Sequence, residues 1–471
     1  MHRPNCSLPE LLFDRQLPNK TAMIDAHRTV TYTELAAEVS RIAAGLRARG
    51  VQPGDVIALR LDNSIDYASA FHGALTCGAT ITPVASYATE TDVAAQLALT
   101  NSKLLFDAAL FEQLRNFPES WAGVYPAADR IACLPLSSGT TGAPKAVELT
   151  HANLVANTIQ FSQAVPITSE DTCLAVLPLT HIYGLTALMN TPLLLGATVV
   201  AQNFAVESFL DAHQRHRVTA TFIAPPLARL LATHPDVDRT DFSHLRVIVS
   251  GAAALHPSIG AAAERRVQAK IYQGYGMSEA SPVTHIAQHH DTPLDSIGSP
   301  LPDTEVRIVD PETLLDTDGV GELWIRGPQV MRGYLGDPEA TSHTIVAGGW
   351  LRTGDLARRA GHNYFIVDRL KDLILSHGFQ VSPVKLETLL LDCPGVQDCA
   401  VVRGYSDSGE EHPVAVIVGD ASEHHVMNFM AERVNRYEQI REVRYVPSIP
   451  RSAAGKTLRR ALAEDFQPPS A

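Results

Sequence analysis

The chain has 471 residues, a hydrophobic content of 45% and a formal net charge of −13. This length exceeds one compact core, and the apolar content is ample for two or three domains, which excludes a wholly disordered protein. Because 51 Asp and Glu outnumber 38 Lys and Arg, non-specific attraction to nucleic acid or anionic lipid is not expected. An anionic substrate must then be bound by local groups.

The cysteines and the first residues bear on location. The six cysteines show neither a C-x-x-C pair nor zinc-site spacing, which favours free thiols in a reducing compartment. The first residues lack the basic-then-apolar order of a secretory signal. We therefore expect a cytoplasmic protein.

The first clear unit is a helix followed by a strand. Thr33 can cap a helix whose apolar positions recur at helical spacing from Leu35 to Leu46, and Gly50 ends it. The run Val56–Leu61 then predicts a strand. Similar units recur up to about residue 300, which indicates an α/β protein with parallel or mixed sheets.

Residues 174–206 carry no Asp, Glu, Lys or Arg and exceed the roughly 20 residues that span a bilayer. Proline, glycine and asparagine residues divide this stretch into short pieces. The run from Thr198 to Ala201 is more typical of a buried strand than of a lipid-facing helix. No membrane span is therefore expected.

Beyond Asp303 the sequence changes to short strands and turns, and a charged junction at Asp368–Asp372 precedes about a hundred residues with their own apolar periodicity. We expect two domains, residues 1–370 and 371–471. The first is a large N-terminal domain of mixed sheets packed with helices. The second is a small, mobile C-terminal α+β domain hinged at the junction.

The most informative segment is a loop rich in hydroxyl groups and glycine after an apolar run. Its glycines let backbone N–H groups approach an anion, its hydroxyls add donors and its lysine adds charge. A Walker-type loop is excluded because no G-x-x-x-x-G-K-[ST] spacing occurs. A surface turn is the alternative, but the combination favours a polyphosphate site made of Ser137, Ser138, Gly139, Thr140, Thr141, Gly142 and Lys145.

This loop resembles the phosphate-binding signature of the adenylate-forming superfamily of acyl-CoA synthetases, adenylation domains and luciferases. Four later segments resemble the other signatures of that superfamily, in the same chain order. They are an adenine and magnesium segment at Gln273–Glu279, a ribose segment at Gly349–Asp355, a hinge at Asp368–Asp372 and a catalytic-lysine segment at Pro450–Lys456. The resemblance covers nearly the whole chain.

The resemblance implies roles for individual residues, and each role makes chemical sense. Glu279 is expected to help hold Mg²⁺, which prefers carboxylate and phosphate oxygens. Asp355 is expected to accept hydrogen bonds from the ribose hydroxyls, with Arg369 as a second ribose or phosphate contact. The remaining nucleotide contacts implied by the adenine segment are Gly274, Tyr275, Gly276 and Ser278.

Lys456 is the implied catalytic lysine. A carboxylate must attack an α-phosphate although both partners are anionic, and a cation between them offsets the repulsion. By the same resemblance, the C-terminal domain rotates about Lys371 after adenylation. The side that carries Gly378 then faces the active site in place of the side that carries Lys456. There the pantetheine arm of coenzyme A can approach the acyl adenylate.

The acyl pocket is implied by two further segments. His181 resembles the histidine that orients the carboxylate or gates the site, although a satisfied core histidine is an alternative. Tyr183, Val249, Gly251 and Ala252 fall where the family lines its pocket. The strings around these residues resemble coumarate-CoA ligases and related aryl or medium-chain acyl-CoA synthetases most closely. Those ligases often carry a lysine where this chain has Val249, which argues against 4-hydroxycinnamate.

The sequence therefore predicts an enzyme, an AMP-forming acid–thiol ligase that uses ATP and Mg²⁺ and transfers the acyl group to CoA. Transfer to an amine or to a carrier protein remains open, because the acceptor comes from outside the chain. A luciferase-like oxygenase and a non-catalytic nucleotide-binding regulator are further alternatives. Retention of Lys456, Glu279 and Asp355 argues against a regulator, whereas the identity of the acid and the oligomeric state cannot be read from the sequence.

Overall fold

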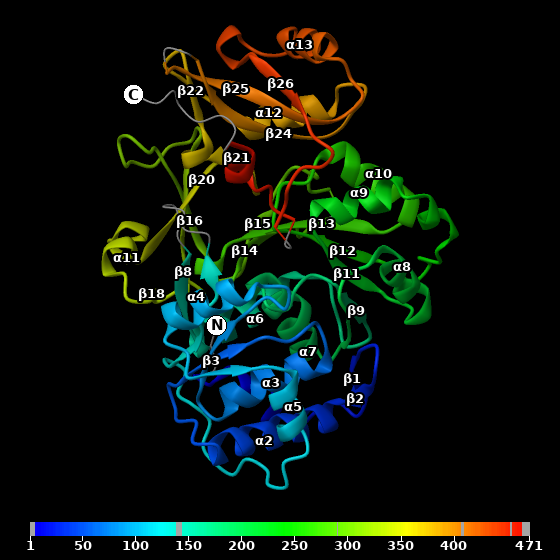
Figure 1. The fold of residues 1–471 in the computed structure, drawn as a ribbon, viewed down its shortest axis with the longest axis vertical. Helices are drawn as coiled ribbons and strands as arrows, with labels where there is room; N and C mark the ends of the chain where they lie inside the picture. Colours follow the sequence, from blue (N-terminus) through cyan, green and yellow to red (C-terminus); the bar gives the residue numbers. More distant parts are fainter. Residues whose placement is uncertain (1–4, 138–143, 290, 407–408, 453–454, 464–471) are drawn as a thin grey trace. The chain divides into compact units, whose positions relative to one another are not determined.

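The computed structural model describes residues 5–137, 144–289, 291–406, 409–452 and 455–463. It divides the chain into two compact units (Figure 1), one made of residues 1–306 and 325–352 and the other of residues 307–324 and 353–471. The units do not divide at residue 370, because the strands before the charged junction belong to the second unit. The expected domain boundary at residue 370, with its hinge, stays a prediction.

A nine-stranded mixed sheet lies in the first unit. Its central strands pair in parallel, and its outer pairs are antiparallel. Central strands such as β11 (Ala220–Ile223) are buried along their whole length, as expected for a parallel sheet covered on both faces. In sheet order the strands are β15 (Ser299–Pro300), β14 (Val283–Ile286), β13 (Lys270–Gly276), β12 (Val247–Ser250), β11, β9 (Thr172–Ala175), β10 (Thr198–Ala201), β1 (Thr21–Ile24) and β2 (Thr29–Thr31).

A second mixed sheet of seven strands also belongs to the first unit. In sheet order it contains β18 (Gly333–Tyr334), β8 (Lys145–Thr150), β6 (Ile131–Cys133), β4 (Thr80–Pro83), β3 (Val56–Leu59) and β5 (Leu104–Phe106), with β7 (Leu136–Ser137) paired to β8. Antiparallel pairing of β7 and β8 sets Ser137 opposite Lys145. The predicted phosphate loop therefore joins two strands of a hairpin.

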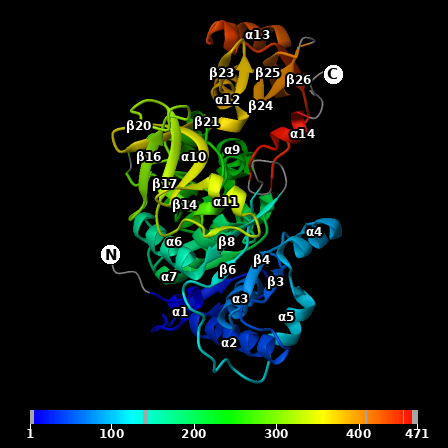
Figure 2. The same cartoon turned by 90° about the vertical axis from the view of Figure 1, so that its left-hand side faces the viewer.

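Helices pack against these sheets, and Figure 2 shows α2, α3 and α5 gathered beside β3 and β4. The helices of the first unit are α1 (Leu8–Phe13), α2 (Tyr32–Ala48), α3 (Ile65–Thr76), α4 (Glu90–Thr100), α5 (Ala108–Leu114), α6 (His151–Ala164), α7 (Thr191–Leu195), α8 (Val206–Arg215), α9 (Pro225–Thr233), α10 (Pro257–Val267) and α11 (Pro338–Thr344). Short non-α turns are η1 (Gly184–Asn190), η2 (Pro235–Arg239) and η3 (Ser278–Ala280), and a short strand, β19 (Ile345–Val346), precedes β20.

The first predicted helix has a different cap from the one expected. Thr31, not Thr33, caps α2, since its hydroxyl accepts the N–H of Glu34 while the Glu34 carboxylate accepts the N–H of Thr31. This reciprocal capping box starts the helix two residues earlier than the apolar spacing indicated. Gly50 follows the helix with a φ of 83°, as predicted, and the strand ends at Leu59 rather than Leu61.

The uncharged stretch 174–206 folds as the sequence indicated. It contains the end of β9, the π-helical turn η1, the short helix α7 and the buried strand β10, whose bounds match the prediction. Over the residues that the structure describes, no helix is both long enough and apolar enough to cross a bilayer.

The second unit begins with strands that carry the ribose segment. They are β16 (Glu305–Val309), β17 (Gly321–Arg326), β20 (Trp350–Ala360) and β21 (Asn363–Arg369), and β21 pairs with β20. The later elements are η4 (Leu370–Asp372), the hairpin β22 (Ile374–Ser376) and β23 (Phe379–Val381), α12 (Pro383–Leu391), β24 (Val396–Tyr405), β25 (Glu411–Gly419), α13 (Glu423–Ala431), η5 (Arg436–Glu438), β26 (Glu442–Tyr445) and α14 (Arg459–Ala463).

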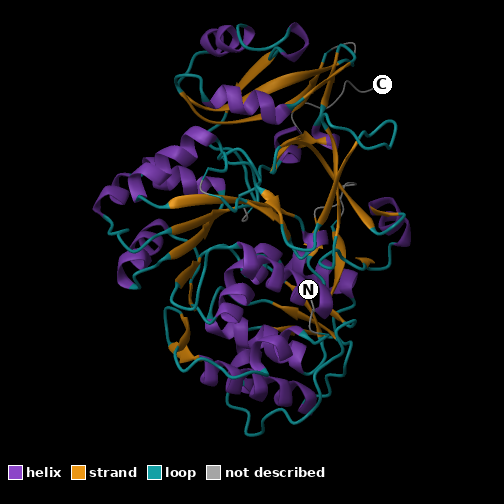
Figure 3. Ribbon diagram, turned by 180° about the vertical axis from the view of Figure 1, so that it is seen from behind, coloured by secondary structure: helices purple, strands orange, loops and turns teal. Residues whose placement is uncertain are grey.

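The C-terminal part of the second unit has its own core on both faces of a three-stranded sheet. Side chains alternate between the two faces of a sheet along a strand. Val401 of β24 lies on the face covered by α12 and α13, in one core cluster with Leu386 and Met430. The neighbouring Val402 faces the opposite side, with Leu462 of α14. Figure 3 shows α12 and α13 in purple beside the strands. The expected small α+β domain is confirmed.

Candidate active site

The carboxyl ends of the parallel strands carry the predicted acyl and adenine segments. His181 and Tyr183 lie after β9, Gly251 and Ala252 follow β12, and Gly274 lies in the last half of β13. In open α/β sheets, ligands bind at this edge. The fold therefore brings segments from three parts of the sequence to one edge of the nine-stranded sheet.

Tyr183 is buried against the end of β12. Its hydroxyl donates to the carbonyl of Val249 at 3.2 Å, and a Cβ added to Gly251 would lie 3.2 Å from the tyrosine Cζ. Val249 itself is 1% exposed. The structure thus joins Tyr183, Val249 and Gly251, which the sequence placed together only by resemblance.

Two backbone positions near this edge are unusual. Ala252 is exposed and adopts a φ of 71°, a conformation that is uncommon for a residue with a Cβ and that gathers at functional sites. Gly276 passes so close to the next strand that a Cβ would lie 2.1 Å from the carbonyl oxygen of Pro282. Only glycine fits at that position in β13.

His181 is exposed, so the alternative of a core histidine is wrong. Its Nδ1 accepts the backbone N–H of Tyr183 at 3.2 Å, which fixes the orientation of the ring. Its carbonyl accepts the N–H of Leu185, at the start of the π-helical turn. Single-turn π-helices are frequent at functional sites.

Lys145 and Glu279 meet around one tyrosine. The hydroxyl of Tyr334 on β18 donates to Glu279 Oε1 at 2.9 Å, and the ammonium of Lys145 lies 5.2 Å from the centre of the Tyr334 ring. Lys145 also pairs with Asp337 at 3.2 Å. Burial and the Glu279 carboxylate raise the pKa of Tyr334, so this phenol remains a hydrogen-bond donor.

Sequence analysis missed both Tyr334 and Asp337. Asp337 caps α11 by accepting the N–H of Ala340, and that contact together with the Lys145 ammonium lowers the pKa of the Asp337 carboxyl. The available signal was the string Gly-Tyr-Leu-Gly-Asp-Pro at residues 333–338. It is too common to indicate a site by itself.

Five of the seven predicted phosphate-loop residues lie outside the described residues. They are Ser138, Gly139, Thr140, Thr141 and Gly142. The two flanking members, Ser137 and Lys145, are described and lie opposite each other in the β7–β8 pair. Ser278, the first residue of η3, leads directly into the buried Glu279.

The surroundings of Glu279 fit Mg²⁺. The carboxylate is 6% exposed, one of its oxygens accepts the Tyr334 hydroxyl, and an ionised carboxylate has further acceptor positions. Mg²⁺ is usually held by one or two carboxylates together with substrate phosphates. Glu279 is therefore a suitable protein ligand for the cation of a magnesium–nucleotide complex.

The ribose segment of the second unit forms an ion pair. Asp355 on β20 lies opposite Arg369 on β21, with Arg369 Nε 3.1 Å from Asp355 Oδ1. The turn before Asp355 is fixed by Glu322, which sequence analysis missed and whose carboxylate accepts the N–H of Gly354 at 3.1 Å. Asp355 and Arg369, the two predicted ribose contacts, thus lie side by side.

Lys456 belongs to the same group of charges. Burial, with smaller contributions from Arg369 and Lys371, lowers the pKa of its ammonium to about 8, while Asp355 and Asp372 act in the opposite direction. The N–H of Ser452 donates to the carbonyl of Lys456, and the N–H of Lys456 donates to the hydroxyl of Ser452. The structure thus places the predicted catalytic lysine among the predicted ribose and hinge residues.

Lys371 and Gly378 occupy the start of the C-terminal part. Lys371 lies in η4, and Arg403 of β24 donates to its carbonyl at 3.5 Å and to that of Leu373 at 2.8 Å. Gly378 forms the turn between β22 and β23 with a φ of 81° and open space where a Cβ would lie. A side chain at this position would project into that space.

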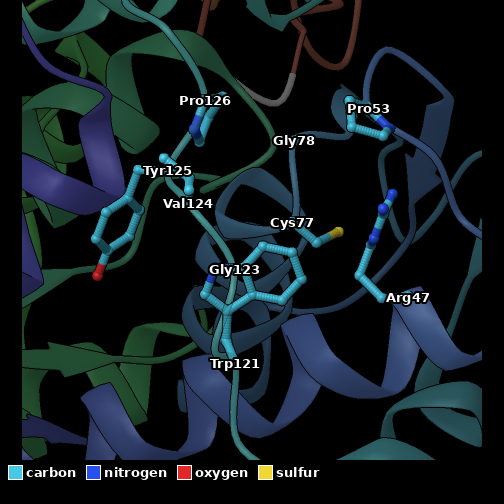
Figure 4. A pocket seen from close by; sticks show the side chains of 9 residues that line it. All are labelled: Arg47, Pro53, Cys77, Gly78, Trp121, Gly123, Val124, Tyr125 and Pro126. Carbon is cyan, nitrogen blue, oxygen red and sulfur yellow. The ribbon is translucent and has the colours of Figure 1, made fainter.

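A pocket of about 300 Å³ lies elsewhere in the first unit. Figure 4 shows Arg47, Cys77, Trp121 and Val124 around it. Pro53 and Gly78, which also line it, precede β3 and β4. It is therefore at the amino ends of these strands and contains none of the predicted site residues.

Comparison with known proteins shows the family to which the chain belongs. Residues 13–335 match the model of the AMP-binding enzyme family, and residues 385–456 match that of the AMP-binding enzyme C-terminal domain. The 4-coumarate-CoA ligase 1 of Petroselinum crispum is 35% identical over 97% of this chain and 95% of its own.

Two solved structures extend the comparison to the fold. ATP-bound MatB of Rhodopseudomonas palustris has a TM-score of 0.91 and 25% identity over 98% of this chain and 99% of its own. The amide bond synthetase McbA of Marinactinospora thermotolerans has a TM-score of 0.87 and 26% identity over 98% and 99%. The predicted fold and resemblance are confirmed, and the chain belongs to the AMP-binding enzyme family.

Proposed function

We propose that this chain is an AMP-forming acid–thiol ligase that converts a carboxylic acid to its acyl adenylate and then transfers the acyl group to coenzyme A. The observation that carries the proposal is the charge group of the second unit. Lys456 lies within electrostatic reach of the Asp355–Arg369 pair. A lysine beside a ribose-binding carboxylate is placed to meet the α-phosphate of the same nucleotide.

In the first half-reaction, an oxygen of the substrate carboxylate bonds to the α-phosphorus of ATP and the bond to the β-phosphate oxygen breaks. Pyrophosphate leaves, and the acyl group remains on AMP. Asp355 accepts hydrogen bonds from the ribose hydroxyls, and His181 orients the carboxylate. Lys456 stabilises the negative charge shared by carboxylate and phosphate, an effect that depends on fixed placement.

The hairpin loop and the adenine segment bind the nucleotide. The loop from Ser137 to Lys145 binds the β- and γ-phosphates, while Gly274, Tyr275 and Gly276 contact the base. Bound Mg²⁺ would neutralise phosphate charge, with Glu279 as its protein ligand. Tyr334 orients this carboxylate by donating to one of its oxygens.

In the second half-reaction, the thiol sulfur of CoA attacks the acyl carbonyl, AMP departs and the thiol proton is released. We place the domain boundary for this step at Lys371, so that residues 371–471 rotate and bring the Gly378 turn to the acyl adenylate. The curated relative named above is a CoA ligase, which supports CoA as acceptor. None of the six cysteines, all of which are described residues, forms a disulfide, in keeping with a cytoplasmic location.

The products of ATP cleavage test the proposed activity. Incubation with ATP, Mg²⁺ and a panel of aryl, aliphatic and dicarboxylic acids should release AMP and pyrophosphate in an acid-dependent manner. Hydroxylamine should trap the adenylate as a hydroxamate, and CoA should replace the hydroxamate by a thioester. ADP and orthophosphate as products would show that the α-phosphate is not attacked.

Transfer to an amine is the second candidate function. It is favoured by the likeness to an amide bond synthetase, which covers 98% of this chain. The two candidates share the adenylation step and differ in the acceptor. The test compares the rate of amide formation from a supplied amine with the rate of thioester formation from CoA. A faster rate of amide formation would support the second candidate.

Val249 predicts a preference among aryl acids. A buried valine cannot pair with a ring hydroxyl, and an unpaired buried hydroxyl costs roughly 1 to 3 kcal/mol. Cinnamate should therefore have a higher kcat/KM than 4-hydroxycinnamate, by about 5- to 150-fold. Val249→Thr should narrow this ratio, whereas Val247→Thr on the same face of β12 should leave it unchanged. A wild-type preference for the hydroxylated acid would refute the pocket assignment.

Lys456 predicts a basic limb in the pH profile of adenylation. The lysine acts as a cation, and its pKa is about 8, so its charged fraction falls as pH rises through that value. The kcat/KM for ATP should decline about tenfold per pH unit above the limb. Lys456→Arg should move the limb to higher pH, because guanidinium stays protonated. An unchanged limb in this variant would assign it to another group.

A further inference from the structure

The end of strand β21 is tied to helix α12 across the predicted hinge. The carboxylate of Asp368, next to Arg369, accepts the hydroxyl of Ser382 and, at 3.1 Å, the N–H of Val384. Asp368 precedes Lys371 in the chain and α12 follows it. The contact therefore fixes how the C-terminal helix lies against the strand that carries Arg369.

Helix α12 in turn holds the segment that follows Lys456. Arg459 Nη2 lies 2.7 Å from both carboxylate oxygens of Glu387 on α12, and Arg459 Nη1 lies 3.8 Å from Asp372 Oδ2. Glu387 Oε1 also accepts the N–H of Val401 at 2.7 Å. Since Arg459 lies three residues after Lys456, its pairing with Glu387 ties the segment that follows Lys456 to α12.

The linkage is made of charged groups that are buried or partly buried, since Asp368 is 1% exposed and the side chains of Glu387 and Arg459 are 17% and 22% exposed. Burial raises the pKa of both Asp368 and Glu387, and Arg459 opposes this rise at each carboxyl. Removing one member of such a group leaves a charge without compensation. The path from Asp368 through α12, Glu387 and Arg459 to Lys456 thus resists small displacements.

We propose that Asp368 is a positioning residue for Lys456 that acts in the adenylation step only. This inference rests on the proposed function. The Asp368–α12 contact forms in the hinge orientation in which Lys456 lies among Asp355 and Arg369. Rotation about Lys371 carries α12 away from Asp368 and breaks the contact, whereas Glu387 and Arg459 both follow the hinge and stay paired.

The test compares half-reactions in cap variants. Asp368→Ala and Ser382→Ala should each slow acid-dependent ATP–pyrophosphate exchange by about 5- to 30-fold, the scale expected for losing one cap contact. Thioester formation from supplied acyl adenylate should stay within about twofold, since it does not use the contact. Asp368→Asn should retain most of the exchange, because its amide oxygen still accepts the N–H of Val384.

Ser422→Ala is the matched control. Ser422 caps α13 by accepting the N–H of His425, so its loss costs similar stability in the same part of the chain without touching the hinge. Both half-reactions should be unaffected in this variant. Equal loss of both half-reactions in Asp368→Ala, or loss of neither, would overturn the inference while leaving the proposed function in place. A wild-type chain without acid-dependent exchange would overturn the proposed function itself.

Discussion

Lys456→Ala is expected to slow acid-dependent pyrophosphate release on the order of 10²- to 10³-fold, the scale for losing one charge-stabilising donor. The ammonium is half-buried near the Asp355–Arg369 pair, where an electrostatic contact is stronger than in water. Thioester formation from supplied acyl adenylate should survive, because Lys456 stabilises charge during attack on the α-phosphate. That attack is already complete in the acyl adenylate. Single-turnover measurements of each half-reaction test this.

A second lysine provides the control. Lys385 on α12 pairs with Glu438, and the groups that act on Lys456 do not include it. Lys385→Ala should therefore leave pyrophosphate release near the wild-type rate while removing one positive charge from the same unit. If Lys456→Ala impaired both half-reactions equally, the lysine would serve folding or nucleotide affinity rather than the first chemical step.

Gly378→Trp is expected to do the reverse. Gly378 lies at the tip of the β22–β23 turn, and among the described residues no atom beyond its chain neighbours lies within 4 Å of the position of a Cβ, so a tryptophan projects outward instead of clashing. If pantetheine approaches past this turn, the indole blocks it, and thioester formation should fall at least about tenfold. Hydroxamate trapping without CoA should continue at the wild-type rate.

Backbone strain at this position needs its own control, because a φ of 81° disfavours any residue with a Cβ. Gly361, in the turn between β20 and β21, has a φ of 62° and equally open surroundings. Gly361→Trp carries a comparable penalty at a site away from the proposed thiol path. A matching loss of thioester formation in both variants would attribute the effect to strain.

Local patterns predicted individual elements well where a single physical preference dominated. The bounds of β10 followed from a run of β-branched and small residues between a glycine and polar residues. The cap of α2 was misplaced by two residues, because apolar spacing sets the buried face of a helix but not its first turn. The first turn of α2 is set instead by the reciprocal hydrogen bonds of Thr31 and Glu34.

The resemblance of whole segments, rather than single residues, is what placed Asp355, Glu279 and Lys456 in one predicted site, and their roles stay predictions. Residues that act by holding others were missed. Tyr334 reaches Glu279 only because β18 pairs with β8, and Glu322 reaches Gly354 across neighbouring strands. Asp368 was expected to belong to a charged hinge. Its contact with the first turn of α12 could not be predicted, because it depends on how the chain after Lys371 folds back toward β21. Such contacts arise from tertiary pairing and leave no local pattern.

The most direct test of the proposed mechanism uses an acid substrate labelled with a heavy oxygen isotope in its carboxylate. Attack of that carboxylate on the α-phosphorus carries one labelled oxygen into AMP when the acyl group leaves. The proposed mechanism predicts labelled AMP and unlabelled pyrophosphate, by mass spectrometry of a complete reaction with ATP, Mg²⁺ and CoA. Label in orthophosphate, or AMP without label, would contradict attack at the α-phosphate and with it the assignment of Lys456.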